Sequence, residues 1–219
     1  DRVGDAPLST SNSQSYNMIP SDISPYVPAY VGNQIANNFS MTFDGINDYI
    51  DASTLSVTGD WSVSLWVNSN STSYQTAVQL SNSTTTGTND SSIFLYFYPG
   101  GTSAKWGFYD GSTTLIGLTA LNTGQWYHLV VTKSGTTYTL FLNGVQENQG
   151  TKANINIQDL LIGKRSLNLF YMDGKIDEVA IFDTALNAGQ IYNDIYQPTA
   201  TATNKTADFV NNPNLPNPV

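Results

Sequence analysis

The sequence predicts an all-β fold, a sandwich or barrel of short strands. Strand-like runs follow one another from about residue 38 to residue 183, and polar turns containing Gly, Asn and Asp separate them. Charged residues make up only 11% of the chain and aromatic residues 12%, a composition that suits many short strands joined by polar turns. The sequence therefore favours an all-β domain over a helical or mixed one.

The strand-like runs show apolar and polar residues in alternation. In order they are FSMTFDG, YIDAS, WSVSLWVN, TAVQLS, SIFLYFY, KWGFYDG, TLIGLTAL, QWYHLVVTK, TYTLFLNG, LLIGKR and KIDEVAIFD. The period of two is clearest in WSVSLWVN, whose two faces carry Trp61, Val63, Leu65 and Val67 on one side and Ser62, Ser64 and Trp66 on the other. One face of this strand is expected in the core.

Turn signals separate these runs. Asn143-Gly144 is the strongest, because both central residues of a type I′ hairpin turn need a positive φ. Weaker signals of the same kind are Asp44-Gly45, Asp110-Gly111 and Asp173-Gly174. Each is expected to be a turn between neighbouring strands.

One short helix and two extended arms complete the prediction. The run TALNAGQIYNDIY has helical periodicity, with Leu186, Ile191 and Ile195 expected to be buried. Residues 1–37 and 198–219 are rich in Pro, Asn, Ser and Thr and lack sustained periodicity, so they are predicted to be an N-terminal arm and a C-terminal tail or linker. The domain itself is expected to span residues 38–197.

Charge and residue usage exclude several classes of function. The net charge is −9 and only eight residues are Lys or Arg, which argues against a nucleic-acid partner because the phosphate backbone requires clustered cations. Cysteine is absent, so the chain has no disulfide, thiolate metal site or cysteine nucleophile. No apolar run approaches the roughly 20 residues that a membrane span requires.

Few residues suit catalysis. Glycoside hydrolysis usually needs two carboxylates across the scissile bond, and the chain contains only two glutamates, Glu147 and Glu178. Glu147 follows the hairpin turn and is expected to be solvated, while Asp177 and Glu178 are neighbours on one strand and should point to opposite faces. The one histidine, His128, is more simply interpreted as a structural residue beside the core than as a general base. No catalytic residue is predicted.

Two kinds of ligand are suggested by the residues. FDGINDYID places Asp44, Asn47, Asp48 and Asp51 within eight residues, where their oxygen atoms could bind Ca²⁺ or simply cap turns. Exposed aromatic side chains could stack on sugar rings, although strand aromatics are more often core; the candidates are Trp66, Tyr96, Tyr98, Trp106 and Tyr109. Loops 69–76 and 82–91 could supply polar contacts to such a sugar.

The motifs MTFDGINDYID, WSVSLWVN, TGQWYHLVVTKSGTTYTLFLNGVQ, LLIGKR and DGKIDEVAIFDTALNAGQI, in this order, resemble concanavalin A-like lectin/glucanase domains of the laminin G-like, pentraxin-related type. The resemblance covers about residues 38–197. It implies a two-sheet antiparallel jelly-roll sandwich. It also implies that the strands carrying FDGINDYID and KIDEVAIFD meet, and that Asp44, Asp48 and Asp177, with backbone oxygens, hold a structural Ca²⁺.

The resemblance also bears on function. Glycoside hydrolases of this fold carry a Glu-x-Asp-x-x-Glu strand motif that is absent here, so an enzyme is not expected. A non-catalytic binding or adhesion module, with possible carbohydrate binding, is expected instead. The alternative is a soluble or secreted calcium-dependent carbohydrate-binding lectin-like domain of a bacterial protein, and a glycoside hydrolase ranks behind both.

The flanks suggest a setting for the domain. The run NDIYQPTATATNKTADFVNNPNLPNPV resembles the ends of laminin G-like structural proteins of marine bacteriophages. This resemblance implies a capsid decoration or fibre subunit that forms an oligomer and whose N-terminal arm contacts other virion or surface-assembly subunits. The expected location is the virion surface or the cell exterior, where cell-surface glycans could be further partners.

Overall fold

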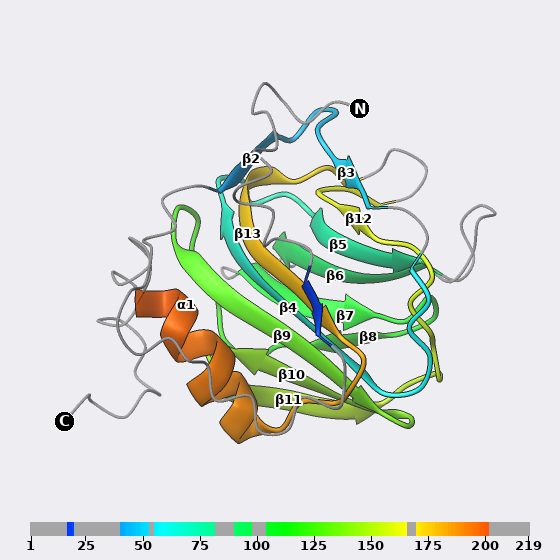
Figure 1. The fold of residues 1–219 in the computed structure, drawn as a ribbon. Helices are drawn as coiled ribbons and strands as arrows, with labels where there is room; N and C mark the ends of the chain where they lie inside the picture. The colour runs from blue at the N-terminus through cyan, green and yellow to red at the C-terminus, as the bar shows by residue number, and fades with distance from the viewer. Residues whose placement is uncertain are drawn as a thin grey trace.

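The computed structural model describes residues 17–19, 40–52, 55–81, 90–97, 104–165 and 170–201. They form two sheets packed face to face, with a helical segment lying across the outer side of one sheet (Figure 1). Almost all strand pairs are antiparallel. The predicted two-sheet jelly-roll sandwich with a short helix near the C-terminal end is confirmed.

The larger sheet has seven strands in the order β1-β13-β4-β9-β10-β11, with β2 also paired to β13. Its strands are β1 (Asn17–Ile19), β2 (Met41–Asp44), β4 (Trp61–Ser69), β9 (Trp126–Ser134), β10 (Thr137–Leu142), β11 (Val145–Thr151) and β13 (Asp173–Phe182). β1 is parallel to β13, and β2 is antiparallel to it. The last strand therefore lies between β4 and the two N-terminal strands.

The smaller sheet has six strands in the order β3-β12-β5-β6-β7-β8. They are β3 (Ile50–Asp51), β12 (Leu161–Ile162), β5 (Gln75–Ser81), β6 (Asp90–Phe97), β7 (Ala104–Tyr109) and β8 (Thr114–Ile116). Every predicted strand-like run contributes a strand to one of the two sheets. β1 and β11 were not among the predicted runs, because β1 has only three residues and β11 (VQENQGT) is almost entirely polar.

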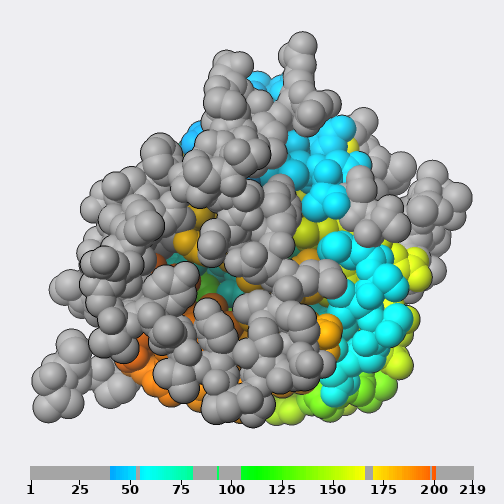
Figure 2. Space-filling view, viewed as in Figure 1, coloured from blue at the N-terminus to red at the C-terminus, as the bar shows by residue number. Residues whose placement is uncertain are grey.

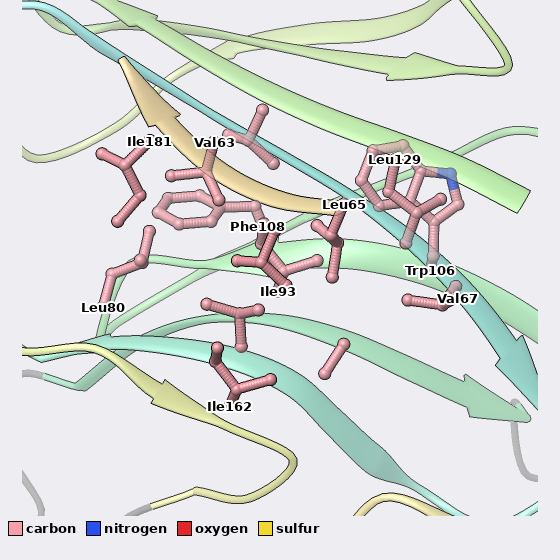
Figure 3. Packing of buried hydrophobic residues seen from close by; sticks show 14 of the residues in the cluster. Val63, Leu65, Val67, Leu80, Ile93, Trp106, Phe108, Leu129, Ile162 and Ile181 are labelled. Carbon is pink, nitrogen blue, oxygen red and sulfur yellow. The ribbon is translucent and has the colours of Figure 1, made fainter. Parts of the chain in front are cut away.

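The core lies between the sheets and draws on both (Figure 3). The β4 side chains Val63, Leu65 and Val67 are fully buried there, as the alternation in the sequence predicts. Phe108 and Tyr138 stack at 5.1 Å between ring centroids, so strands of both sheets meet through aromatic rings. At roughly 1.5–3 kcal/mol for each large apolar side chain removed from water, this layer supplies most of the force that holds the sheets together.

The outer face of the seven-stranded sheet is also covered. The helical segment consists of a π-helical stretch, η3 (Gln190–Tyr196), followed by α1 (Gln197–Thr201), and crosses the sheet at the lower left of Figure 1. Trp66 stacks on Tyr196 with ring centroids 5.7 Å apart, and its indole N–H donates to Thr199 Oγ1 at 2.8 Å. Trp66 is therefore buried although it lies outside the main core.

The π-helical geometry changes which predicted helix residues are buried. Ile191 is buried against Val130 and Phe141, and Leu186 packs against the same cluster, as expected. Tyr196 is fully buried instead of Ile195, because wider helical turns shift the inward face along the sequence. α1 continues to Thr201, past the predicted domain boundary at residue 197. No helix in the described ranges is long and apolar enough to cross a membrane.

The hairpin turn between β10 and β11 supports this helical segment. Asn143 and Gly144 have φ values of 50° and 77°, as the predicted type I′ turn requires. The Asn143 N–H donates to the His128 carbonyl, and the His128 N–H donates to Asn143 Oδ1, both at 2.8 Å. A Cβ on Gly144 would lie 2.7 Å from Tyr192 and 2.9 Å from Tyr196. The turn therefore fits closely beneath the helix only because residue 144 is glycine.

The predicted turn at Asp173-Gly174 is wrong, because both residues begin β13. Gly174 has φ +147°, and a Cβ there would lie 2.1 Å from the Asn68 carbonyl oxygen. Glycine is needed at this position for the close approach of two strands. The glycine at position 174 therefore marks a close approach between two strands and not a turn.

The connection between the sheets runs along one side of the sandwich. Residues 55–60 lead from β3 to β4 and follow the right-hand edge in Figures 1 and 2. Val57 and Ile157 exchange backbone hydrogen bonds of 2.9 and 3.0 Å, and both side chains are buried in the core. This connection therefore closes the side of the core as well as linking the sheets.

The predicted turn at Asp110-Gly111 is confirmed and is held by the Asp110 carboxylate. Asp110 Oδ1 accepts from Thr113 N at 2.7 Å and from Ser112 N and Oγ at 2.9 Å. Burial acts to raise the pKa of Asp110, but these hydrogen bonds outweigh it and lower the pKa from 3.8 to about 2. The carboxylate is only 6% exposed, so it acts as an internal cap for the turn.

Gly144→Ala and Gly135→Ala test whether the hairpin turn supports the helix. Both glycines have positive φ, but a Cβ on Gly135 meets nothing within 4 Å. We expect Gly135→Ala to lower the free energy of unfolding by about 1 kcal/mol through backbone strain alone. Gly144→Ala should cost about 1–3 kcal/mol more, because its methyl group collides with two tyrosines. Urea unfolding followed by tryptophan fluorescence measures both; equal losses would contradict the support role.

Asp110→Asn tests the charged cap. Because the folded pKa lies below the unfolded value of 3.8, the carboxylate stabilises the fold above about pH 4, and this contribution is lost as the pH falls toward about 2. The shift corresponds to about 2 kcal/mol. We expect the difference in unfolding free energy between wild type and Asp110→Asn to shrink between pH 4 and pH 2. A difference that is independent of pH would show that the charge is not involved.

Candidate functional site

The strand register gathers several loops at one end of the sandwich. β13 begins with Asp173, opposite Asp44 at the end of β2, and the end of β4 flanks its other side. The Asp173 N–H donates to Gln75 Oε1, at the start of β5, at 2.7 Å. β9 also begins here, with Trp126 opposite Asn68. This region is termed the loop end and comprises residues 44–49, 68–75, 122–126 and 170–173.

Asp44 and Asp48 close the first loop of the loop end. Asp44 Oδ1 accepts from Ile46 N at 2.8 Å and from Asn47 N at 3.3 Å. Asp48 Oδ2 accepts from Asp44 N at 3.0 Å. The hydrogen bond from Ile46 is the main cause that lowers the pKa of Asp44, so this carboxylate is ionised at neutral pH. Two acidic residues predicted to act together are thus neighbours in a tight loop.

Asp177, the third predicted calcium ligand, does not lie beside them. The register places Asp173 opposite Asp44, and Asp177 is four residues further along β13. Four residues of a strand span about 13 Å, beyond the reach of a shared cation. In the described part of the chain, no three His, Cys, Asp or Glu side chains are grouped closely enough to hold a metal ion. A cation near Asp44 and Asp48 would need backbone carbonyls or water as further ligands.

A β-bulge explains the position of Asp177. The ladder between β13 and β4 is interrupted between Asp177 and Ala180, and Glu178 has φ 51°. Ile176 and Val179 both enter the core although they are three residues apart, a spacing that regular alternation would put on opposite faces. The prediction that Asp177 and Glu178 point to opposite faces assumed unbroken alternation, which the bulge interrupts by inserting an extra residue.

Gln75 holds the loop between β4 and β5 in one conformation. Its side chain is 2% exposed, and its amide N–H groups donate to Ser69 Oγ at 2.9 Å and to the Ser71 carbonyl at 3.1 Å. The amide oxygen accepts from Asp173 N. Asn70 also binds this strand, since its N–H donates to the Asp173 carbonyl at 2.9 Å. The Ser- and Asn-rich loop predicted to supply polar contacts is therefore preorganised.

An aromatic pair lies beside this loop. Tyr74 and Phe170 contact each other with ring centroids 4.5 Å apart and ring planes 58° apart. Phe170 is 38% exposed and has φ 54°, which is a strained conformation for a bulky residue. Its carbonyl accepts from Thr76 N at 2.8 Å, which ties the strained residue to β5. Such strain is often concentrated at ligand-binding positions.

A second aromatic residue stands at the rim of the loop end. Tyr49, at the end of the Asp44 loop, is exposed, and Lys164 Nζ lies 3.4 Å from the centroid of its ring. This cation–π contact fixes the orientation of the tyrosine. Neither Tyr49 nor the Tyr74–Phe170 pair was singled out from the sequence, because only the tertiary contacts distinguish these rings from core aromatics.

The aromatic residues that the sequence did single out have different environments. Trp66 and Trp106 are buried. Tyr109 is half-buried, with Arg165 over its ring at 5.1 Å and its hydroxyl donating to the Gly111 carbonyl. The Tyr96 side chain and all of Tyr98 lie outside the described residues, as does most of loop 82–91. Among the predicted sugar-stacking aromatics whose side chains the structure describes, Tyr109 is the one that is not fully buried.

The two glutamates lie far apart on the seven-stranded sheet. Glu147 is on β11 and Glu178 on β13, with β4, β9 and β10 between them. Four strand spacings amount to about 19 Å, whereas glycosidase carboxylates are about 5–9.5 Å apart. Glu147 was predicted to be solvated, but its two carboxylate oxygens accept hydrogen bonds from Trp106 Nε1 at 2.6 Å and from Thr119 N at 2.8 Å. This pair cannot flank one glycosidic bond.

His128 is buried, as predicted for a structural residue. It is 1% exposed and lies against the rings of Trp66 and Tyr196. Its Nε2 is 2.7 Å from Ser64 Oγ. Although Ser and His form a hydrogen-bonded pair, the helical segment covers them, so a substrate has no access to the hydroxyl in this conformation.

The sequence places the chain in a family. Residues 44–192 match the profile described as the concanavalin A-like lectin/glucanases superfamily. The chain belongs to this superfamily. The matched region begins at the loop end and runs through β13 into the helical segment, so it contains the whole smaller sheet and all strands of the larger sheet except β1 and most of β2. No curated protein sequence gives a significant match to the chain.

Solved structures share the fold of this superfamily member. The heptameric SAP-like pentraxin from Limulus polyphemus matches with a TM-score of 0.58 and 15% identity, over 69% of this chain and 78% of the pentraxin. Domain 4 of the arabinanase AbnA from Geobacillus stearothermophilus, in complex with arabinotriose, gives 0.55 and 25%, over 72% and 76%. The sialidase carbohydrate-binding module from Ruminococcus gnavus, bound to α2,3-sialyllactose, gives 0.51 and 11%, over 67% and 95%.

Calcium binding at the Asp44 loop is a prediction that a melting experiment tests. A cation bound only to the folded state at about 100 times its Kd adds about 2.7 kcal/mol, so EGTA should lower Tm by roughly 5–10 °C and added Ca²⁺ should restore it. Asp48→Asn should remove this response. Asp177→Asn is the matched control and should keep it, because the residue is remote from Asp44. An unchanged Tm in EGTA would remove the calcium prediction.

Proposed function

We propose that this chain is a non-catalytic carbohydrate-binding module whose ligand site is the loop end. The observation that carries the proposal is the Tyr74–Phe170 pair, in which Phe170 is exposed and Tyr74 half-buried, in the same loop end as amide and carboxylate groups. Sugar rings stack their C–H faces on aromatic rings, and their hydroxyl groups bind planar amides and carboxylates. The loop end offers both kinds of contact within one region.

Preorganisation supports this function. Gln75 fixes the β4–β5 loop, and the hydrogen bonds of Asp44 and Asp48 fix the neighbouring loop. A ligand that binds to fixed loops loses less conformational free energy on association. The strain at Phe170 is consistent with a side chain held outward for contact rather than for packing.

The charge of the region favours a neutral sugar. Asp44, Asp48 and Asp173 lie in the loop end, and the chain carries a net charge of −9. A sialylated or uronic sugar would meet like charges, which lowers both affinity and association rate. The likeness to the AbnA domain solved with arabinotriose, at 25% identity, supports a neutral oligosaccharide of this kind.

Binding without catalysis agrees with the positions of the acidic residues. The two glutamates are four strand spacings apart in the seven-stranded sheet, and Asp177 and Glu178 are adjacent residues at one bulge. The helical segment covers the Ser64–His128 pair. No pair of these groups is arranged to serve as acid and base across one bond, so we assign no reaction to the site.

A second candidate is a subunit of a virion or another surface assembly. It is motivated by the Pro-rich N-terminal arm, by flanks that resemble those of phage structural proteins, and by β1, a piece of that arm that pairs with the edge of the domain. The two functions are compatible, since a module on the outside of a particle or cell could also bind glycans. Under either function the chain acts outside the cytoplasm.

Phe170→Ala and Tyr74→Ala test the carbohydrate site. Loss of an aromatic stacking contact costs about 0.5–1.5 kcal/mol, so we expect affinity for arabinotriose, measured by calorimetry, to fall up to about tenfold in each variant. Phe170→Gly should lose the same affinity without added backbone strain, because glycine accepts φ 54° readily. α2,3-Sialyllactose should bind more weakly than arabinotriose to the wild type.

Tyr109→Ala is the matched aromatic control, since Tyr109 lies at the far end of β7, next to the Asp110 turn. It should leave arabinotriose binding unchanged. Loss of binding in Tyr109→Ala with none in Phe170→Ala would move the site away from the loop end. A glycan array without any bound sugar would contradict the proposed function itself.

Deletion of residues 1–37 tests the assembly role. If the arm provides the contacts between subunits, the shortened chain should no longer enter the assembled particle, as measured by its share of purified particles. Its Tm should be little changed, because the arm contributes only β1 to the described sheets. Normal incorporation of the shortened chain would contradict the assembly role of the arm.

A further inference from the structure

The edge of β13 is filled by two separate strands from the N-terminal part of the chain. β2 pairs with residues 173–176 and β1 with residues 180–182. Between these segments lies the bulge at Glu178, where β13 departs from regular geometry. Because β2 begins opposite Ile176, it leaves the second half of the edge available to another strand.

β1 is held at this edge alone. It lies at the end of its sheet, with β13 as its one neighbour among the described strands, and it contains only three residues. Pro20 follows directly and has no N–H to donate, which explains why the ladder stops at Ile19. The strand is therefore a small, separable addition to a sheet that is otherwise complete.

The chain between β1 and β2 is much longer than its path on one molecule requires. Ile19 lies opposite Phe182 and Met41 opposite Ile176, a separation of about 20 Å along β13. Residues 20–40 join them and can span up to about 70 Å when extended. A domain of this size is only about 40 Å across, so β1 of one copy can reach the same edge on an adjacent copy.

We propose that residues 180–182 of β13 form a strand-acceptor site for β1 of a second copy of this chain. The exchanged pair keeps the register Asn17 to Ala180, Met18 to Ile181 and Ile19 to Phe182. Since the contacts are the same within one copy and between copies, local concentration decides which pairing prevails. Copies held together in an oligomer or particle are then linked by their arms.

Charge affects this exchange in a measurable way. Each copy carries a net charge of −9, which opposes close approach of two copies. Main-chain hydrogen bonds of a strand pair do not depend on that charge. Added salt screens the repulsion and should therefore increase the fraction of exchanged arms. This inference deepens the assembly role and is independent of glycan binding.

Cysteine pairs test the exchange in the full chain, because the natural sequence has no cysteine. The Asn17→Cys chain and the Ala180→Cys chain are mixed in urea, refolded together and oxidised. The protein concentration is about 1 mM, because that matches the effective concentration that a flexible tether typically gives its own arm. Register partners are at a separation that a disulfide accepts. We expect a disulfide-linked dimer of the two variants on a non-reducing gel, several-fold above the control, and more of it at 0.5 M salt.

The control mixes Asn17→Cys with Thr123→Cys, an exposed position away from this edge, and reports disulfides formed by random collision. A dimer yield equal to that control would overturn the proposal. The double variant Asn17→Cys/Ala180→Cys is oxidised in parallel. If it closes only within single chains while the mixture gives no dimer, the arm pairs within its own copy and the proposal is wrong. Failure to form either disulfide would also overturn it. Neither result affects the arabinotriose test.

Discussion

The antiparallel pairing of β13 with β4 is the contact on which the rest of the structure depends. It requires glycine at position 174, where a Cβ would lie 2.1 Å from the Asn68 carbonyl. This close approach places β13, the last strand of the domain, between β4 and the two N-terminal strands β1 and β2. Loops from distant parts of the sequence then meet at the loop end, and the bulge at Glu178 divides the opposite edge of β13 between β2 and β1.

The helical segment determines which surfaces remain for ligands. Its Tyr196 packs on Trp66 and His128 and buries them on the outer face of the seven-stranded sheet, which would otherwise offer an open aromatic surface. Burial of this face stabilises the sandwich, because a sheet with two dry faces removes more apolar area from water. Recognition is consequently left to loops at the strand ends and to the sheet edge, two places where backbone geometry rather than core packing decides the contacts.

The two proposed roles use different parts of the domain, the loop end for a sugar and the edge of β13 for a strand of a second copy. The loop end presents aromatic, amide and carboxylate groups on loops fixed by Gln75, Asp44 and Asp48, which suits a small polar ligand. The edge of β13 presents main-chain hydrogen-bonding groups, which suit a strand of any composition that lacks proline at the paired positions. Binding at one place leaves the other free, so adhesion and assembly can coexist in one small domain.

The sequence by itself determined the all-β fold class, because alternation with period two and turn residues act locally: it predicted eleven of the strands, the type I′ turn at Asn143-Gly144 and the buried face of β4. It also predicted that Asp44 and Asp48 lie together, since they share one loop. Only the tertiary structure decided that Asp173, rather than Asp177, lies opposite Asp44, that Glu147 binds Trp106, and that Tyr74 meets Phe170. These contacts join residues that are far apart in the chain, so no local pattern can specify them. A one-residue bulge also reverses the face of the sheet to which every later side chain points.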